Sequence, residues 1–454
     1  MSKHVLVIDI GSTKICAIIA AIDENKEIQI SGVGISKAQG LKKGSITNID
    51  LASKSIKSAL SDASRVAGVD VKSAIVSISG AYTKSVDSNG LVNIPNKEIT
   101  TKEIYRAMSN SLYNASIPSE YEMLHTLPFN FKVDEQEFVE DPRGMNAARL
   151  DVTSHIIMVQ RSSLSNLKKA VKAAGVDVQS VILSSYASSI AVLSEDEKEL
   201  GVASVDIGGS TSNIVIHAGT SIKYDDFIGV GSNHITNDLS MALHTPLATA
   251  EEVKLAHGTL HTSTNDLIEI PVIGDENEKH EVSLEVVHNV IYARIEETLM
   301  IIAQSLDNSK LKESMGAGVV LTGGLTKIDG IRDLAIAVFG NMPVRLARPN
   351  NVKGLIDTMK DPSYSAAIGL VKYAAGAYTP YEIDVNKNMR HANEDKSITE
   401  FRSLENIATT KSSENVDTHS SKEPKMVNIE ENKKINQDET SPISKFWNWA
   451  TQLF

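Results

Sequence analysis

The chain of 454 residues has little of several features that mark particular classes of protein. Its single cysteine, Cys16, excludes a disulfide within the chain, and the apolar residues around it indicate a small buried side chain. It has no run of roughly 18 apolar residues, the length that a membrane-spanning helix needs. The first apolar run reaches Asp9 too early to form the core of a signal peptide. We therefore expect a cytoplasmic protein.

Positive charge is also scarce, because 45 basic residues stand against 57 acidic ones and the net charge is −12. A chain of this charge is a poor non-specific binder of nucleic acid, so we expect no nucleic-acid partner. Aromatic residues make up only 5%, and both tryptophans lie close to the C-terminus. The hydrophobic share of 41% still suffices for several units with buried cores.

One short phrase occurs twice, as Asp9-Ile10-Gly11-Ser12-Thr13 and as Asp206-Ile207-Gly208-Gly209-Ser210-Thr211. Each copy lies between two apolar runs, which predicts a strand, a tight glycine turn and a second strand. A single turn of this kind is most simply an ordinary hairpin turn. Two copies in matching contexts favour two similar halves that face each other across a cleft.

The chemistry of the two turns suits a nucleotide phosphate. Glycine turns expose backbone N–H groups that bind anions, and neighbouring hydroxyls and a lysine add further donors. Asp9 and Asp206 would hold Mg²⁺, through water, because magnesium keeps part of its hydration shell. Asp206 is also a candidate general base. The predicted phosphate ligands are Gly11, Ser12, Thr13, Lys14, Gly208, Gly209, Ser210 and Thr211.

Two further patterns fit a nucleotide site. Gly323 and Gly324 follow a buried strand and would let the backbone approach an adenine or ribose, although a helix-entry turn explains them equally well. Glu251 and Lys254 share a face of a predicted helix and could hold a ribose or base edge. The simpler alternative for this second pair is a solvated salt bridge.

The composition changes near residue 384. Residues 385–440 contain one aromatic residue and no glycine, which predicts a disordered tether. Residues 441–454 then predict an amphipathic helix that binds a membrane surface, with folding back onto the body as the alternative. Its predicted membrane-facing side chains are Ile443, Phe446, Trp447, Trp449, Ala450, Leu453 and Phe454.

The order of these motifs resembles the actin/DnaK/sugar-kinase superfamily. In its terms the two turns are phosphate 1 and phosphate 2, residues 319–324 are the adenosine motif, and 185–193 and 365–371 are the two connecting helices. Within the superfamily, the chain is similar to the FtsA family of bacterial cell-division proteins. That likeness rests on the run from Glu195 to Val202 before phosphate 2 and on Ala250–Lys254 followed by His257-Gly258. It also rests on an insert at 84–163 and on the amphipathic segment at 441–454.

The resemblance implies an α/β, actin-like two-lobed ATPase fold with an inserted α+β subdomain, a disordered C-terminal tether and an amphipathic C-terminal helix. The expected division is subdomain 1A at 1–83 plus 164–197, inserted subdomain 1C at 84–163, subdomain 2A at 198–240 plus 316–384, subdomain 2B at 241–315, a linker at 385–440 and a membrane-targeting helix at 441–454.

The resemblance also implies a function. Such a protein binds ATP and Mg²⁺, polymerises on the inner membrane, tethers the FtsZ ring there through the FtsZ C-terminal peptide, and recruits later division proteins. This places it on the cytoplasmic face of the bacterial inner membrane at the division site. For the partner peptide we consider Arg294, for which an intrahelical pair with Glu297 is the alternative.

Two other functions stay open, an ATP-dependent small-molecule kinase and a chaperone-like ATPase of the same superfamily. The stretch before the first connecting helix, Ser184-Ser185-Tyr186, offers only hydroxyls to an attacking water. We therefore expect ATP binding with at most slow ATPase activity.

Overall fold

The computed structural model describes residues 3–390 except for 220, 262–265, 350–351 and 355–356. The predicted membrane helix and the tether beyond residue 390 therefore lie outside the described residues. Among the helices that are described, none combines the length and the apolar character needed to cross a membrane.

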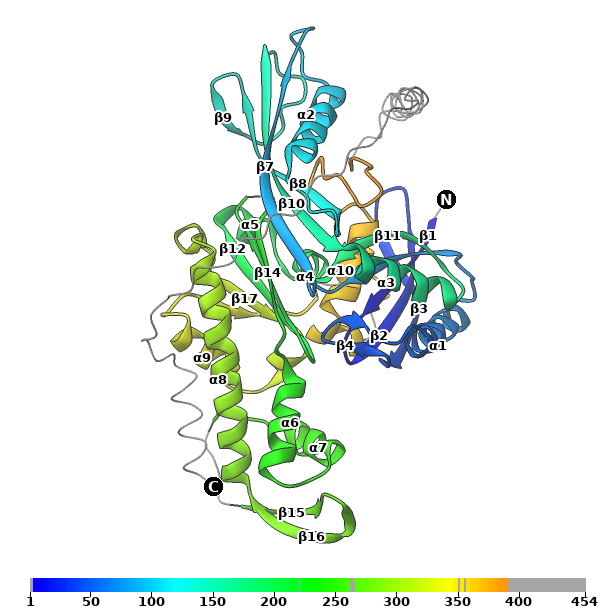
Figure 1. Ribbon diagram of the computed structural model, residues 1–454, viewed down its shortest axis with the longest axis vertical. Coiled ribbons are helices and arrows are strands. Elements are labelled where there is room, and N and C mark those ends of the chain that lie inside the picture. The colour runs from blue at the N-terminus through cyan, green and yellow to red at the C-terminus, as the bar shows by residue number, and fades with distance from the viewer. Residues whose placement is uncertain (1–2, 220, 262–265, 350–351, 355–356, 391–454) are drawn as a thin grey trace, which may run out of the picture. The chain divides into compact units, whose positions relative to one another are not determined.

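Lobe 1 is built on a five-stranded sheet. Its elements are β1 (Lys3–Ile10), β2 (Lys14–Ile22), β3 (Ile28–Lys37), β4 (Leu41–Lys42), β5 (Ser45–Ile46), α1 (Ile49–Ala67), β6 (Ser73–Ile78), α3 (Arg161–Ala173), β11 (Asp177–Leu183), α4 (Ser184–Val192) and α10 (Ser365–Ala374). The sheet order is β11-β6-β1-β2-β3, with β1 to β3 antiparallel and β6 and β11 parallel to β1 (Figure 1). Strands β1 and β2 are almost wholly apolar because both of their faces are buried.

Lobe 2 repeats this topology. Its elements are α5 (Glu195–Leu200), β12 (Val202–Ile207), β13 (Ser212–His217), β14 (Ile222–Ile228), α6 (Ser232–Ala242), α7 (Leu247–His257), β15 (Leu267–Val272), β16 (Asp275–Ser283), α8 (Leu284–Asn308), β17 (Val319–Thr322), α9 (Ile331–Val338) and β18 (Val344–Leu346). The sheet order β14-β13-β12-β17-β18 has the same antiparallel meander and the same two parallel strands. The expectation of two similar halves is thereby confirmed.

An insert interrupts lobe 1 between β6 and α3. It consists of β7 (Thr83–Asn93), α2 (Thr101–Asn114), β8 (Tyr121–Val133), β9 (Gln136–Val139) and β10 (Arg149–Gln160). Its antiparallel sheet has the order β7-β10-β8-β9, and α2 packs on β7 and β10 over a core of its own. Figure 1 shows it extending away from the lobe 1 sheet.

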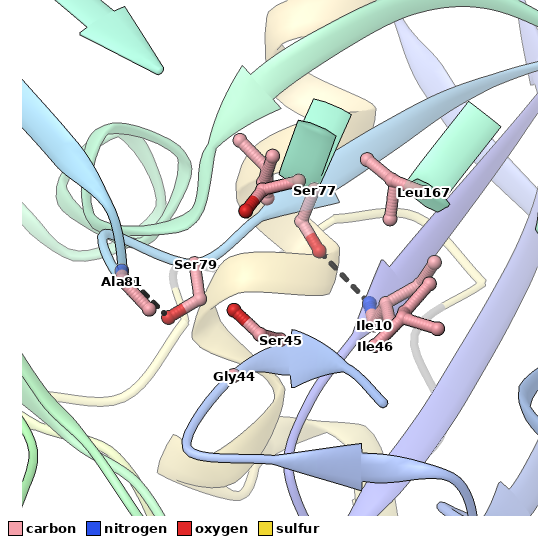
Figure 2. Close-up of a pocket in the computed structure, with 10 residues that line it drawn as sticks. Ile10, Gly44, Ser45, Ile46, Ser77, Ser79, Ala81 and Leu167 are labelled. Atoms are coloured by element: carbon pink, nitrogen blue, oxygen red, sulfur yellow. Dashed lines mark hydrogen bonds between the residues drawn. The ribbon is translucent and has the colours of Figure 1, made fainter. Parts of the chain in front are cut away.

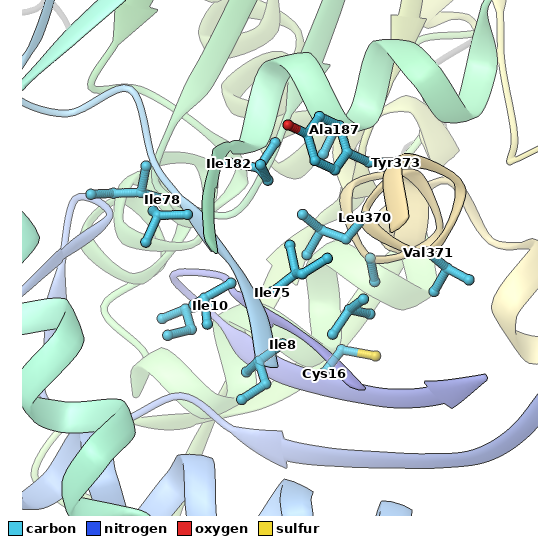
Figure 3. Packing of buried hydrophobic residues seen from close by; sticks show 14 of the residues in the cluster. Ile8, Ile10, Cys16, Ile75, Ile78, Ile182, Ala187, Leu370, Val371 and Tyr373 are labelled. Carbon is cyan, nitrogen blue, oxygen red and sulfur yellow. The ribbon is translucent and has the colours of Figure 1, made fainter. Parts of the chain in front are cut away.

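The two connecting helices, α4 and α10, cross in contact with each other. Figure 3 shows Ala187 of α4 beside Leu370 and Tyr373 of α10, above the buried strand residues Ile8 and Cys16. At the crossing, a side chain at Gly369 would come within 1.7 Å of the carbonyl oxygen of Ala187. Small residues such as Ala187 and Gly369 predict a close crossing of these two helices, and the structure confirms it.

Replacing Gly369 by valine should force the two helices apart. We expect a loss of about 3 kcal/mol or more in the free energy of unfolding, because the added atoms meet backbone that cannot rotate away. Urea unfolding would measure it. The matched control is Gly324→Ala, whose new Cβ would have only Ser363 nearby, at an ordinary contact distance of 3.6 Å. Equal losses for both variants would contradict the close crossing.

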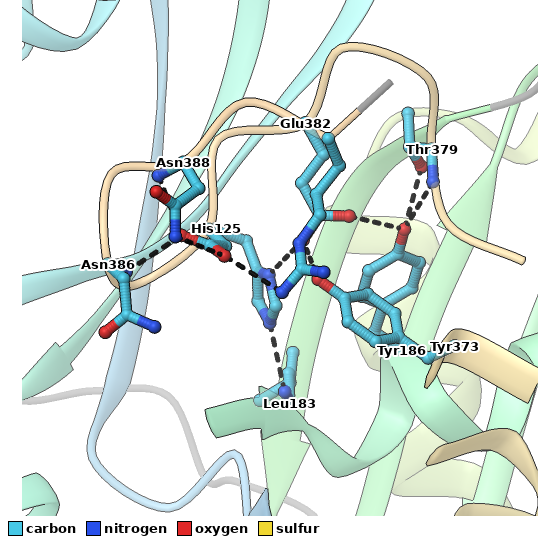
Figure 4. Close-up of polar contacts among 10 residues, drawn as sticks. His125, Leu183, Tyr186, Tyr373, Thr379, Glu382, Asn386 and Asn388 are labelled. Carbon is cyan, nitrogen blue, oxygen red and sulfur yellow. Dashed lines mark hydrogen bonds and ion pairs between the residues drawn. The ribbon is translucent and has the colours of Figure 1, made fainter. Parts of the chain in front are cut away.

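The last described segment, residues 379–390, forms a strap across the junction of lobe 1 and the insert. Ile383 pairs with Thr126 of β8, and the Arg390 N–H donates to the Glu382 carbonyl oxygen at 2.7 Å. The buried Glu382 carboxylate accepts hydrogen bonds from His125, Tyr186 and Tyr373 at 2.8, 3.0 and 2.8 Å (Figure 4). Residues 385–390 thus belong to the folded body, and the predicted tether does not begin at 385.

Candidate nucleotide site

Each predicted phosphate turn closes in the same way. The N–H of Gly11 donates to the carbonyl oxygen of Lys14 at 3.1 Å, and the N–H of Gly208 donates to that of Thr211 at 2.8 Å. Both turns join the first two strands of their sheets, β1 to β2 and β12 to β13. The repeated phrase therefore forms the same local structure twice.

The two turns contact each other directly. The Ser210 N–H donates to the Ser12 hydroxyl at 3.1 Å, and a side chain at Gly209 would come within 2.7 Å of the Thr13 methyl carbon. The Ser12 hydroxyl of lobe 1 and the Ser210 N–H of lobe 2 therefore converge on one place, and a converging set of such donors suits an anion.

Two buried carboxylates lie behind the turns. Asp9 accepts a hydrogen bond from the Ser77 hydroxyl at 2.7 Å, and burial raises its pKa. Burial and the nearby Asp9 raise the pKa of Asp206 to about 7, although a hydrogen bond from Ser188 opposes the shift. Two carboxylates that repel each other in a buried place are suited to a cation.

The donor set fits Mg²⁺ only with help from other ligands. Among the described side chains, no three histidine, cysteine, aspartate or glutamate residues cluster closely enough to hold a metal ion. A magnesium ion here would therefore take phosphate oxygens and water in addition to Asp9 and Asp206. This is how magnesium is commonly held at nucleotide sites.

Lys14 has partners on the loop that precedes α10. Its ammonium donates to the Ser363 hydroxyl at 2.6 Å and lies 3.2 Å from the ring centroid of Tyr364. Burial lowers its pKa, and the charge of Asp9 opposes this shift. A phosphate that took this ammonium would have to displace or share the Ser363 contact.

The predicted adenosine residues lie beside phosphate 2. Gly323 has a positive φ of 91°, and a side chain there would meet the Asp206 carboxylate at 2.4 Å and the Ile207 backbone. Gly324 faces Ser363. The positive φ and the close approach to β12 explain why glycine occupies position 323.

Glu251 and Lys254 form an ion pair at 2.6 Å on α7. The Lys254 ammonium also donates to the Thr236 hydroxyl of α6 at 2.9 Å, and its side chain is only 6% exposed. The salt bridge considered for these residues is present, but only Glu251, at 41% exposure, is solvated, whereas Lys254 is buried. It fastens α7 to α6, whose first residues contact the phosphate 2 turn.

Sequence reasoning missed several polar residues around the turns. The Asn233 amide donates to the Ser210 hydroxyl at 3.0 Å, and the N–H groups of Ser232 and Asn233 donate to the carbonyl oxygens of Gly208 and Gly209. The sequence could have indicated Ser77, because this residue lies near the carboxyl end of β6, a strand parallel to β1. No local pattern points to Asn233.

A small cavity lies beside the phosphate 1 turn (Figure 2). Its volume is about 10 Å³, enough for about one water molecule. Ser77, which bonds Asp9, contributes to its wall, and the other polar side chains there are the hydroxyls of Ser45, Ser79 and Ser163. The cavity wall therefore includes a hydroxyl that is hydrogen-bonded to Asp9, one of the two carboxylates.

Arg294 on α8 pairs with the Glu297 carboxylate, as the alternative predicted, and also with Asp238 of α6. The two Asp238 contacts are 2.5 and 3.1 Å long. A partner carboxylate would therefore have to compete with two carboxylates of the chain itself.

Comparisons with known proteins agree with one family. A family model described as cell division protein FtsA matches residues 203–369, and one described as an SHS2 domain inserted in FtsA matches 80–158. The chain is 38% identical to cell division protein FtsA of Helicobacter pylori strain ATCC 700392 / 26695, covering 86% of each chain. It is 35% identical to that of Pseudomonas aeruginosa, covering 82% of this chain and 89% of the relative.

Solved structures show the fold. A PilM–PilN type IV pilus biogenesis complex matches at 15% identity and a TM-score of 0.58, covering 82% of this chain and 98% of that one. MreB5 of Spiroplasma citri bound to ADP matches at 14% identity and a TM-score of 0.50, covering 81% and 94%. The described body has the actin-like ATPase fold, as expected. By its sequence relatives, the chain belongs to the FtsA family of cell-division proteins.

Proposed function

We propose that the chain binds Mg-ATP between its lobes and acts as a membrane-tethered adaptor of cell division. One observation carries the nucleotide part: the two phosphate turns meet, with two buried carboxylates behind them. The ADP bound in the MreB5 structure is consistent with this use of the fold. Gly11 to Lys14, Gly208 to Thr211, Glu251, Lys254, Gly323 and Gly324 would form the site.

We expect slow turnover. Ser185 and Ser188 of α4 are buried beside the site, and Ser188 bonds Asp206. The Asp206 carboxylate has a pKa raised to about 7, so we keep it as the candidate base. The nucleotide would then serve mainly as a structural or switching ligand.

For the partners, we propose the assignments that family membership suggests. The chain would polymerise, and subdomain 2B, at 241–315, would bind the acidic C-terminal peptide of FtsZ. Exposed apolar side chains occur in this region, including Leu247, Leu255 and Leu267. We keep the expected division with two changes: α10 packs on the lobe 1 sheet and would belong to lobe 1, and the linker would start after the strap.

The C-terminal helix would hold the protein on the inner face of the membrane. A single short helix binds weakly, because each large side chain contributes at most about 1.5–3 kcal/mol and ordering the helix offsets part of it. A filament that presents many such helices would bind strongly through effective concentration.

Two measurements on the full chain test this function. Calorimetry should detect ATP binding that strengthens with Mg²⁺, and the protein should sediment with anionic phospholipid vesicles. Trp447→Asp should abolish sedimentation, whereas Asn448→Asp, which adds the same charge on the opposite helix face, should reduce it less. Absence of ATP binding would overturn the nucleotide assignment. Equal sedimentation of both variants would overturn the membrane assignment.

A further inference from the structure

One face of β14 connects lobe 2 to the insert. Alternate residues of a strand point to the same side, and three such residues of β14 meet the insert or its root. The Lys223 ammonium lies 5.4 Å from the Phe129 ring centroid of β8, Asp225 bonds His155 of β10, and Phe227 packs beside Gly80. The insert therefore contacts lobe 2 although it arises from lobe 1.

His155 is the centre of this contact. Its Nδ1 lies 2.8 Å from the Asp87 carboxylate of β7, and its Nε2 lies 3.0 Å from the Asp225 carboxylate. The side chains of His155 and Asp225 are 5% and 6% exposed, whereas that of Asp87 is 56% exposed. Burial alone would lower the pKa of His155, but the hydrogen bonds to Asp225 and Asp87 outweigh it and raise the pKa to about 9. The ring is therefore an imidazolium that donates to both carboxylates.

The same insert is also fixed to lobe 1. The Leu183 N–H of β11 donates to His125 Nε2 at 3.1 Å, and His125 Nδ1 bonds Glu382 of the strap. Both side chains of the His125–Glu382 pair are fully buried. The insert is thus held at one end by a buried network on lobe 1 and on its flank by the imidazolium contact with lobe 2.

The phosphate turns link this arrangement to the proposed nucleotide. Ser12 and Ser210 now bond each other across the lobes at 3.1 Å. A phosphate oxygen that accepted from both groups would replace this direct bond and separate the turns. Lobe 2 would then shift relative to lobe 1, and the insert could not keep both of its attachments unchanged.

We propose that the contact between His155 and Asp225, here called the clasp, is an autoinhibitory contact that opposes nucleotide binding. It holds lobe 2 in the position in which the two turns touch. The inference rests on the proposed nucleotide site. Coupling between two sites is reciprocal, so a nucleotide that loosens the clasp must bind more tightly once the clasp is removed.

Two variants of the full chain separate the clasp from its neighbour. Asp225→Ala and Asp87→Ala each remove one carboxylate from His155, but only Asp225 belongs to lobe 2. We expect Asp225→Ala to lower the Kd for Mg-ATP about fivefold or more, the lower end of usual allosteric coupling. Asp87→Ala should leave this Kd within about twofold, because it breaks no contact between the lobes.

The outcomes are distinguishable. Wild-type protein that binds no nucleotide would remove the proposed function together with this inference. Wild-type binding with an unchanged or weaker Kd in Asp225→Ala, or with the same gain in both variants, would overturn the clasp alone. If Asp225→Ala fails to fold, Asp225→Asn keeps the shape and removes the charge. The Kd of Asp225→Asn for Mg-ATP should also fall, and an unchanged Kd would again overturn the clasp.

Discussion

The Asp206→Asn variant is expected to be more stable than the wild type at pH 8 and to lose Mg-dependent ATP binding. Burial and Asp9 raise the pKa of Asp206 from 3.8 to about 7. Between these values the folded protein holds a proton that the unfolded chain releases, so the free energy of unfolding falls as the pH rises. Above pH 7 the buried charge of Asp206 lowers the free energy of unfolding by its full amount, of the order of 4 kcal/mol. The amide of the variant carries no charge and avoids this loss.

The same substitution should weaken magnesium-dependent binding. If Asp206 contacts Mg²⁺ through water, losing its charge should reduce Mg-ATP affinity roughly 10–100-fold. Urea unfolding at pH 5.5 and 8, with calorimetry at pH 8, would measure both effects. Exposed Asp177→Asn is the control and should change neither quantity by much. If Asp206→Asn is less stable than the wild type at pH 8, the charged Asp206 carboxylate does not destabilise the folded protein.

Replacing Glu382 by alanine should cause one of the largest losses of stability in the body. Its carboxylate accepts hydrogen bonds from three buried donors, on His125, Tyr186 and Tyr373. The Leu183 N–H donates to His125 Nε2, so the proton of this ring lies on Nδ1 and points to Glu382. Without the carboxylate these donors are left in a place that water does not reach. We expect a loss of roughly 3–5 kcal/mol.

Chemical denaturation would measure this loss. The control is Glu137→Ala, which removes an exposed carboxylate that pairs with Lys132 at 3.2 Å. That pair should contribute less than about 1 kcal/mol. Similar losses for the two variants would mean that the strap is not required for the stability of the body.

The parts of the fold that the sequence could predict are those with a repeated or periodic signal. The duplicated turn phrase predicted two halves, and the two sheets do share one topology. Small residues in 185–193 and 365–371, among them Ala187 and Gly369, predict a close crossing, and α4 and α10 do cross closely. Helix ends follow from local contacts as well: apolar residues at helical spacing predict a helix over 51–67, and α1 begins two residues earlier, at Ile49. Its cap is the side chain of Asn48, which accepts from the Leu51 N–H at 3.0 Å.

The parts that could not be predicted depend on distant partners. Glu382, Asp384 and Arg390 give the strap a polar composition typical of a linker. Glu382 is nevertheless buried because other segments supply its hydrogen bonds, whereas the buried Asp384 pairs with Arg390 of the strap itself. Arg294 likewise takes Asp238, a partner from another helix, in addition to the expected Glu297. Around the turns, Asn233 lies in the first turn of α6 and Ser363 in the 3-10 turn before α10, and neither belongs to a repeated motif.

The strap also determines where mechanical load would enter the body. A pull on the chain beyond Arg390 reaches first the bonds between Arg390 and Glu382, and then the pairing of Ile383 with Thr126. These bonds belong to lobe 1 and the insert. Tension from an anchor at the C-terminus would therefore be borne first at the root of the insert, before it reaches lobe 2.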